Sequence, residues 1–155
     1  MRSAEALAAV VAAKPGGETR PGQEAMCAAV DTALAAGEHL LVEAPTGVGK
    51  SLAYLAPAVA HTRAGPDRAV VVVTATKALQ EQLTRDDLPA LAAALPGRPL
   101  RFAMLKGRSN YLCRAKLDVT MTDGVEARLD FGAGGLPGAL EAVQALAAWA
   151  EDSAT

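Results

Sequence analysis

Aromatic residues and cysteines are scarce in this chain of 155 residues. Phe, Trp and Tyr together make up 3% of it, and its two cysteines are Cys27 and Cys113. Two cysteines do not form a disulfide framework, so we expect a reducing compartment, the cytoplasm. No apolar run approaches the roughly 20 residues that a membrane-spanning helix needs. The first residues lack the basic start and apolar core of a signal peptide, so we expect no contact with a membrane.

A strong net charge is also missing. The chain has 15 Lys and Arg against 17 Asp and Glu, which gives a net charge of −2 at pH 7. This balance excludes a wholly basic coat for nucleic acid, so any such contact must be local. Residues 98–116 carry six basic side chains and no acid, whereas residues 117–155 carry seven acids and one arginine. With 51% apolar residues, the chain is long enough for one domain with a core.

One stretch combines glycines with a lysine and a serine in a defined order. Residues 43–51 read Glu-Ala-Pro-Thr-Gly-Val-Gly-Lys-Ser, with Ala44 where the strict phosphate-binding pattern has its first glycine. An apolar run precedes it and a helix-forming run follows it, which is the context of a P-loop. Lys50 can then reach the β- and γ-phosphates, and the Ser51 hydroxyl can bind Mg²⁺. The alternative is a glycine-rich turn with a solvated lysine.

Apolar runs and helical patterns alternate along the chain. Residues 39–42, 69–73 and 100–105 are short apolar runs, typical of buried strands. Helical patterns cover residues 4–13, 23–36 and 49–62, with Pro57 expected to kink the last of these. Further helices are expected after Lys77 and from Pro89, and a last amphipathic helix over residues 139–151. The order predicts an α/β fold with a doubly wound parallel sheet.

Several polar residues have two interpretations on chemistry alone. Thr76, Lys77 and Gln80 follow the second expected strand, where they suit a phosphate backbone, but a Thr helix cap explains them equally well. Arg20 and Gln23 are typical of an ordinary capped helix entrance. The basic stretch with Tyr111 fits a path for single-stranded nucleic acid, or a solvated run of charges. Cys113 by itself is not a metal site, because one ligand cannot hold a metal.

Four motifs stand in a fixed order: Arg20-Pro-Gly-Gln23, the loop of residues 43–51, Val73-Thr-Ala-Thr-Lys-Ala-Leu-Gln-Glu-Gln-Leu83 and Leu105-Lys-Gly-Arg-Ser-Asn-Tyr-Leu-Cys113. Together they resemble the start of the DinG/XPD-type iron–sulfur ATP-dependent DNA helicases, above all the bacterial DinG-like members. The resemblance covers about residues 18–155. It implies a RecA-like P-loop NTPase sheet that is incomplete here. It also implies an N-terminal extension (1–17), the first part of the ATP-binding domain (18–112), and the start of a helical iron–sulfur insertion (113–155).

The resemblance also implies a role for each matching residue. Arg20 and Gln23 would read adenine, which favours ATP over GTP, and Cys113 would be the first of four ligands of a 4Fe–4S cluster. ATP and Mg²⁺ would be held by Ala44, Thr46, Gly47, Val48, Gly49, Lys50 and Ser51, the last two being the catalytic residues. Single-stranded DNA would contact Thr74, Thr76, Lys77, Gln80, Lys106, Arg108 and Tyr111.

The implied function is ATP-dependent 5′-to-3′ DNA unwinding by a monomer on single-stranded, forked or looped DNA. The sequence departs from the family pattern in three ways. It has one of the four cluster cysteines, no Asp-Glu-x-His box and no second RecA-like domain, so we interpret it as part of a longer helicase. The alternative is a truncated module that binds nucleotide or DNA without turnover. A small P-loop kinase would need lid arginines, for which no clear candidate is present.

We expect the 155-residue chain to hold part of ATP but to hydrolyse it poorly, because the groups that orient the attacking water are missing. Phosphate release from ATP, measured with and without single-stranded DNA, checks this. Turnover comparable to that of an intact helicase would contradict the prediction.

Overall fold

A computed structural model describes residues 2–123 and 138–153 of the chain. The chain divides into two compact units, Met1–Leu105 and Lys106–Thr155, and each is described by itself. The first unit holds the P-loop, the motif of residues 20–23 before it and the motif of residues 73–83 after it. Its helices are α1 (Ser3–Ala12), α2 (Pro21–Ala36), α3 (Lys50–Arg63), α4 (Lys77–Gln82), the π-helical segment η1 (Leu83–Asp87) and α5 (Leu88–Ala94).

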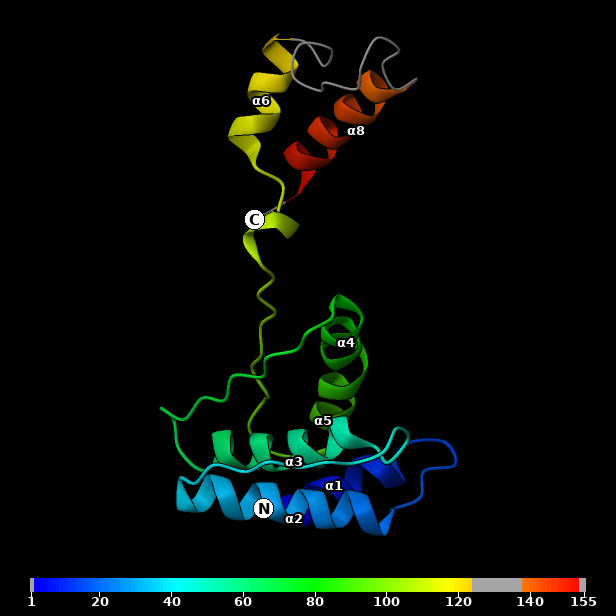
Figure 1. The fold of residues 1–155 in the computed structure, drawn as a ribbon, viewed down its shortest axis with the longest axis vertical. Helices are drawn as coiled ribbons and strands as arrows, with labels where there is room; N and C mark the ends of the chain where they lie inside the picture. The colour runs from blue at the N-terminus through cyan, green and yellow to red at the C-terminus, as the bar shows by residue number, and fades with distance from the viewer. Residues whose placement is uncertain (1, 124–137, 154–155) are drawn as a thin grey trace. The chain divides into compact units, whose positions relative to one another are not determined.

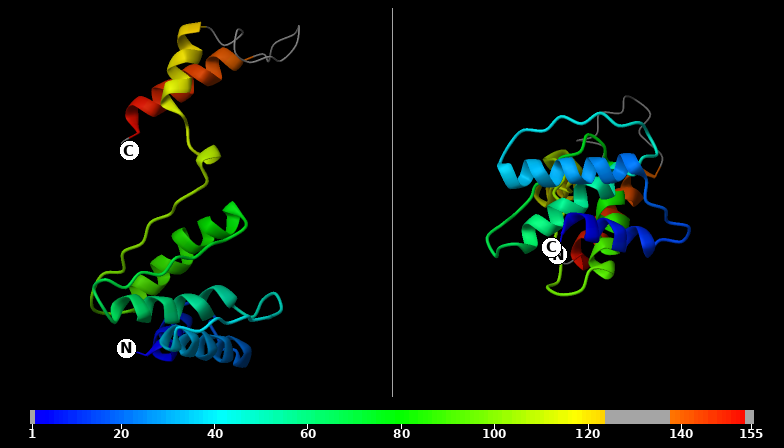
Figure 2. Two further views of the ribbon diagram at one scale, coloured as in Figure 1. Left: turned by 60° about the vertical axis from the view of Figure 1, so that its left-hand side comes forward. Right: turned by 90° about the horizontal axis from the view of Figure 1, so that it is seen from below.

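Helices α1, α2 and α3 lie against one another and form the base of the first unit (Figures 1 and 2). Small residues allow this close packing, because Ala6 on α1 and Ala53 and Ala56 on α3 are completely buried. The Ala-rich composition therefore serves helix-to-helix contact as well as helix propensity. Larger side chains fill the spaces between the helices, and the core also includes Leu7, Val10, Val11, Cys27, Leu52, Leu55, Val59, Leu83, Leu91 and Leu95.

The predicted helix boundaries are largely confirmed, and their causes are local. Pro21 stands in the first turn of α2, where its missing N–H costs nothing, and Gly37 ends the helix in the left-handed conformation with φ of +69°. Helix α3 runs through Pro57, which is fully buried, so the helix continues past the expected kink. The second short helix begins around Pro89, as expected.

The parallel sheet predicted from three apolar runs is not formed in the part of the chain that the structure describes, which contains no β-strand. No backbone–backbone hydrogen bond joins residues 39–42, 69–73 and 100–105. Their side chains stay largely in solvent, with Leu41 98%, Val71 84% and Val73 88% exposed. The reason is that a strand satisfies its backbone groups only through a neighbouring strand, whereas each helix satisfies its own.

The described residues of the second unit form the 3₁₀ turn η2 (Arg108–Asn110) and the helices α6 (Arg114–Asp123) and α8 (Ala139–Asp152), and these two helices contact each other. The predicted last helix is confirmed as α8. Its expected apolar face is not fully covered, since Leu140, Leu146 and Trp149 are exposed. Among the described residues of both units, no helix is long and apolar enough to cross a membrane.

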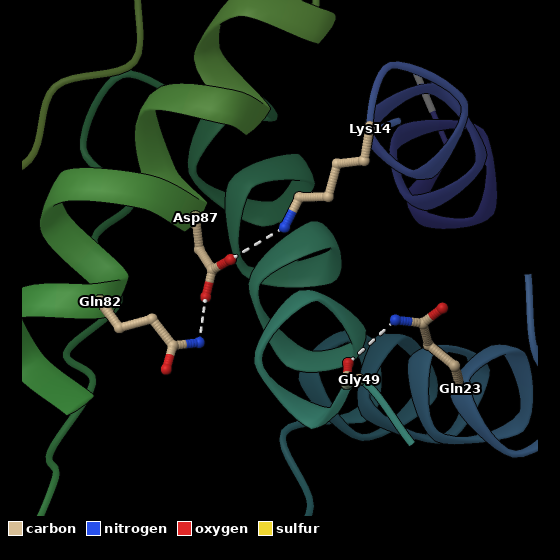
Figure 3. A network of polar contacts seen from close by, with 5 residues as sticks. All are labelled: Lys14, Gln23, Gly49, Gln82 and Asp87. Atoms are coloured by element: carbon tan, nitrogen blue, oxygen red, sulfur yellow. Dashed lines mark hydrogen bonds and ion pairs between the residues drawn. The ribbon is translucent and has the colours of Figure 1, made fainter. Parts of the chain in front are cut away.

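The segment η1, which follows directly after α4, was not predicted, and its Leu83 and Asp87 are buried. The hydroxyl of Thr84 donates to the carbonyl of Gln80 at 2.9 Å, which satisfies an acceptor at the point where the helical register widens. At the end of this segment Asp87 turns into the unit, and its side chain is only 5% exposed. Lys14, just after α1, donates to one carboxylate oxygen at 3.3 Å, and Gln82 donates to the other at 3.1 Å (Figure 3).

We expect Lys14→Met to lower the free energy of unfolding by about 1–3 kcal/mol, because it leaves the buried Asp87 carboxylate without its cation. Urea denaturation followed by circular dichroism measures the change. Lys116→Met, at an exposed position on α6, is the matched control and should have no effect. Equal stability of the two variants would show that the ion pair contributes nothing.

Candidate nucleotide-binding site

The P-loop lies between the apolar run that ends at Val42 and the first turn of α3, and two of its glycines are required by geometry. Gly47 and Gly49 have φ of +84° and +89°, in the left-handed region that other residues rarely adopt. At Gly49 a Cβ atom would also meet Nε2 at the end of the Gln23 side chain, which would then have to move. At Gly47 such an atom would meet nothing, so only the backbone conformation requires glycine.

The lysine of the loop folds back across it. Nζ of Lys50 donates to the carbonyl oxygens of Ala44 and Pro45, both at 2.9 Å. Ala44 thus contributes a backbone carbonyl, which any residue can offer, and its own φ is not positive. This explains why the loop forms with alanine in place of the first glycine. Thr46 lies at the exposed tip of the loop.

Two residues from the start of α2 reach the same loop. Nη1 of Arg20 donates to the carbonyl of Gly47. Nε2 of Gln23 donates to the carbonyl of Gly49 at 3.0 Å, as Figure 3 shows. Gln23 is 4% exposed, and the side chain of Arg20 makes no capping hydrogen bond to its own helix. The structure therefore brings both residues to the P-loop. Their interpretation as an ordinary capped helix entrance does not explain these contacts.

Tyr54, which the sequence analysis did not single out, packs against the core close to the start of α3. It lies one turn after Ser51 on α3, at the i, i+3 spacing at which helical side chains meet. Tyr54 is half-buried, and this burial raises the pKa of its phenol. The spacing from Ser51 is the signal that could have identified it.

An open groove of about 360 Å³ runs beside the P-loop. Its volume is within the range of small-ligand sites, and most of its surface is apolar. One side comes from α2 and the other from the loop itself, including Val48. The lining residues are Gly22, Ala25, Met26, Ala29, Val42, Glu43, Ala44, Pro45 and Val48.

The residues expected to hold DNA fall into both units. In the first unit, the Thr76 hydroxyl accepts from the N–H of Leu79 at 3.3 Å, so it caps α4, as the alternative interpretation held. Thr74 donates to the carbonyl of Thr76 at 3.1 Å, and Gln80 donates to the carbonyl of Leu105 at 3.3 Å. Lys77 is exposed.

In the second unit, the other three DNA candidates cluster around η2. The hydroxyl of Tyr111 accepts from the N–H of Lys106 at 2.8 Å, which closes the turn. Arg108 stands in that turn and is exposed. A cation and an aromatic ring are therefore presented together on a short, hydrogen-bonded loop.

The two cysteines have different environments. Cys27 is buried in α2, and burial raises the pKa of its thiol to about 11, with the Asp31 carboxylate adding to the rise. Cys113 is exposed just before α6. In residues 2–123 and 138–153 there is no group of three or more His, Cys, Asp or Glu side chains that could hold a metal. The residues present do not fit a four-thiolate cluster, since this chain supplies at most one accessible thiolate.

Comparison with known proteins shows which family the sequence of this chain matches. Residues 20–115 match the sequence model of the DEAD/DEAH box helicases. An ATP-dependent helicase DinG of Mycobacterium tuberculosis is 52% identical over 120 residues, which are 75% of this chain and 18% of that protein. The ATP-dependent DNA helicase YoaA of Escherichia coli is 47% identical over 104 residues, 67% of this chain and 15% of the relative.

A protein named 3′-5′ exonuclease DinG, from Bacillus subtilis, is 40% identical over 104 residues, 67% of this chain and 11% of its own length. The chain thus spans less than a fifth of each of these curated relatives. No solved structure matches it. The family match begins at Arg20 and includes the P-loop, α4 and Cys113, the same segments that carry the contacts above. This chain belongs to the DEAD/DEAH box helicase family, which implies a RecA-like P-loop fold.

Proposed function

We propose that this chain is the ATP-binding portion of an ATP-dependent 5′-to-3′ DNA helicase. The observation that carries the proposal is the double contact of Arg20 and Gln23 with the carbonyls of Gly47 and Gly49. These two residues begin the family match, and their side chains fix the loop from a helix that lies about 25 residues upstream. Their position beside the P-loop supports a role for both in recognising adenine. The names of the mycobacterial and Escherichia coli relatives support helicase activity.

The chemistry of the loop supports phosphate binding. The Lys50 ammonium already lies over the loop, where it is held by two neutral carbonyl oxygens. A triphosphate offers charged oxygens in their place, and charge-assisted hydrogen bonds are about twice as strong as neutral ones. Backbone N–H groups at the start of α3 add the positive end of the helix dipole.

Ser51 is the residue that would hold Mg²⁺ together with the phosphates. It stands in the first turn of α3, and its hydroxyl oxygen is a ligand type that Mg²⁺ accepts. When bound, Mg²⁺ neutralises charge on the β- and γ-phosphates. Within this chain, Lys50 and Ser51 therefore orient the triphosphate, while the water-activating groups lie outside the motifs found here.

The sheet of a RecA-like domain is also part of the proposal. Residues 39–42, 69–73 and 100–105 carry apolar side chains that remain exposed, which is the state expected of strands that lack neighbours. We assign these three runs to the parallel sheet of the helicase domain. DNA would then meet Thr74, Thr76, Lys77 and Gln80, which follow the second run, and also Lys106, Arg108 and Tyr111.

The remaining parts of the proposal concern the whole helicase. Its substrate would be single-stranded, forked or looped DNA, and it would act as a monomer in the cytoplasm. Cys113 would be one ligand of a 4Fe–4S cluster whose other ligands this chain does not contain. The alternative is a module that binds nucleotide or DNA without turnover, and the contacts in this chain are equally compatible with the binding step of both.

Binding of a fluorescent ATP analogue with Mg²⁺ tests the proposal. Lys50→Ala removes the charged contact to phosphate, so we expect about 10- to 100-fold weaker binding. Lys116→Ala removes the same charge from an exposed position on α6 and should bind as the unmodified chain does. Binding that is equal in all three proteins would refute phosphate recognition by this loop.

Thiol labelling tests the availability of Cys113. At pH 8 a maleimide should modify one thiol per native chain and two in denaturant. The reason is that burial and the raised pKa of Cys27 lower its thiolate population by about 100-fold. Mass spectrometry of Cys113→Ser, which should stay unmodified when native, is the control. Rapid labelling of that variant would show that Cys27 is accessible.

A further inference from the structure

The segment before the family match, which begins at Arg20, is packed into the first unit. Ala6 and Val10 on α1 are completely buried, and the helix contacts α2, α3 and α5. The hydroxyl of Ser3, at the start of α1, donates to the carboxylate of Asp31 on α2. Helix α1 is thus fixed on the core, and the residues that follow it directly are held in place with it.

Lys14, two residues after the end of α1, reaches the end of η1. Its Nζ atom donates to one oxygen of the Asp87 carboxylate at 3.3 Å, and the side-chain amide of Gln82 donates to the other at 3.1 Å (Figure 3). The Asp87 side chain is only 5% exposed, and a charge that is buried to this extent needs such partners. Gln82 is the last residue of α4. One buried carboxylate therefore joins α1 to α4.

The π-helical turn is what brings Gln82 and Asp87 together. In an α-helix, side chains three or four positions apart are neighbours, whereas these two residues are five positions apart. In η1 the backbone N–H of Leu88 donates to the carbonyl of Leu83, also five positions back, which is the hydrogen bond of a π-helix. Single π-helical turns of this kind occur frequently at functional sites. The bond between Gln82 and Asp87 depends on this turn and stabilises it in return.

Helix α4 depends on contacts outside itself. It has six residues, none of them buried, and a helix of this length is not stable alone. Leu79 packs against the core, and the bond from Gln82 fixes the last turn. At the other end Thr76 caps the helix and Lys77 begins it. Together with Gln80 these two are proposed DNA contacts, so the direction of α4 decides where the proposed contacts lie.

We propose that Lys14, Asp87 and Gln82 are positioning residues for the binding of single-stranded DNA. The inference rests on the proposed function, in which Thr76 and Lys77 contact the DNA backbone. Lys14 holds the Asp87 carboxylate, the carboxylate holds the end of α4, and α4 presents the two contacts at its start. None of the three positioning residues needs to touch DNA. The segment before the family match thus contributes to DNA binding from within the protein.

Binding of a fluorescein-labelled oligodeoxythymidine, followed by fluorescence anisotropy at one fixed salt concentration, tests the proposal. Gln82→Ala keeps the net charge and the pair of Lys14 with Asp87. We expect its dissociation constant for DNA to rise about 2- to 10-fold, as for the loss of one hydrogen bond. Its affinity for the fluorescent ATP analogue should not change, because the contacts of the P-loop with α2 remain. Gln144→Ala, at an exposed position on α8, is the matched control and should bind DNA as the unmodified chain does.

Asp87→Ala separates positioning from simple electrostatic attraction. This variant has one negative charge fewer, which by itself would strengthen attraction to DNA phosphates. Because Gln82 and Lys14 both lose their acceptor, we expect weaker DNA binding instead, and a larger loss than in Gln82→Ala. Circular dichroism checks that the variant is folded. If Asp87→Ala does not fold, Gln82→Ala decides the question, since it leaves the buried ion pair in place.

The outcomes separate this inference from the proposed function. If Gln82→Ala binds the oligonucleotide as the unmodified chain does while Lys77→Ala binds it more weakly, the positioning role is overturned and the proposed DNA contact stands. Equal losses of affinity for DNA and for the ATP analogue in Gln82→Ala also overturn it, because that is the result of a damaged fold. If the unmodified chain binds DNA no better than Lys77→Ala, the proposed contact fails and this inference with it.

Discussion

The burial of helix α3 against α1 and α2 is the constraint on which the first unit depends. Ala53 and Ala56 allow the three helices to approach closely, while Leu52, Leu55 and Val59 fill the space between them. Because α3 begins at Lys50, its packing also fixes where the P-loop ends and which way its first N–H groups face. A helix that is held on two sides can present its first turn as a rigid surface. The core and the nucleotide site therefore share one element.

The P-loop itself is held by two sets of side-chain contacts, and phosphate competes with one of them. Lys50, itself part of the loop, donates to the carbonyls of Ala44 and Pro45. Arg20 and Gln23, at the start of α2, donate to the carbonyls of Gly47 and Gly49. The contacts from Arg20 and Gln23 can persist when phosphate binds, because their acceptors are backbone carbonyls, which cannot bind an anion. The Lys50 contacts compete directly with phosphate for the same ammonium. Nucleotide binding then exchanges one set of partners for another and leaves the loop supported.

Local residue patterns predicted what depends on neighbours in the chain, whereas distant contacts were either implied only by the family resemblance, as for Gln23, or missed. The helix that ends at Gly37, the P-loop and the short helix from Pro89 follow from local backbone preferences, and they were found. Gln23 contacts Gly49, which lies 26 positions further along the chain, and Lys14 pairs with Asp87, which lies 73 positions further. Hydrophobic periodicity in the sequence does not indicate contacts over such separations. The π-helical turn at residues 83–87, which aims Asp87 inward, has no simple sequence signal either. The sheet was predicted from apolar runs alone, but a strand also needs a partner.

The exposed apolar runs show how folding and nucleotide binding are connected in this chain. Full burial of a valine or leucine side chain is worth about 1.5–3 kcal/mol, so the exposed Leu41, Val71 and Val73 leave considerable stabilisation unrealised. Residues 39–42 lead directly into the loop at Ala44, whose carbonyl holds Lys50. Pairing of that run in a sheet would fix the start of the P-loop, just as α3 already fixes its end. A loop fixed at both ends loses less entropy when it binds phosphate. Formation of the sheet should therefore strengthen nucleotide binding without any new contact to the nucleotide.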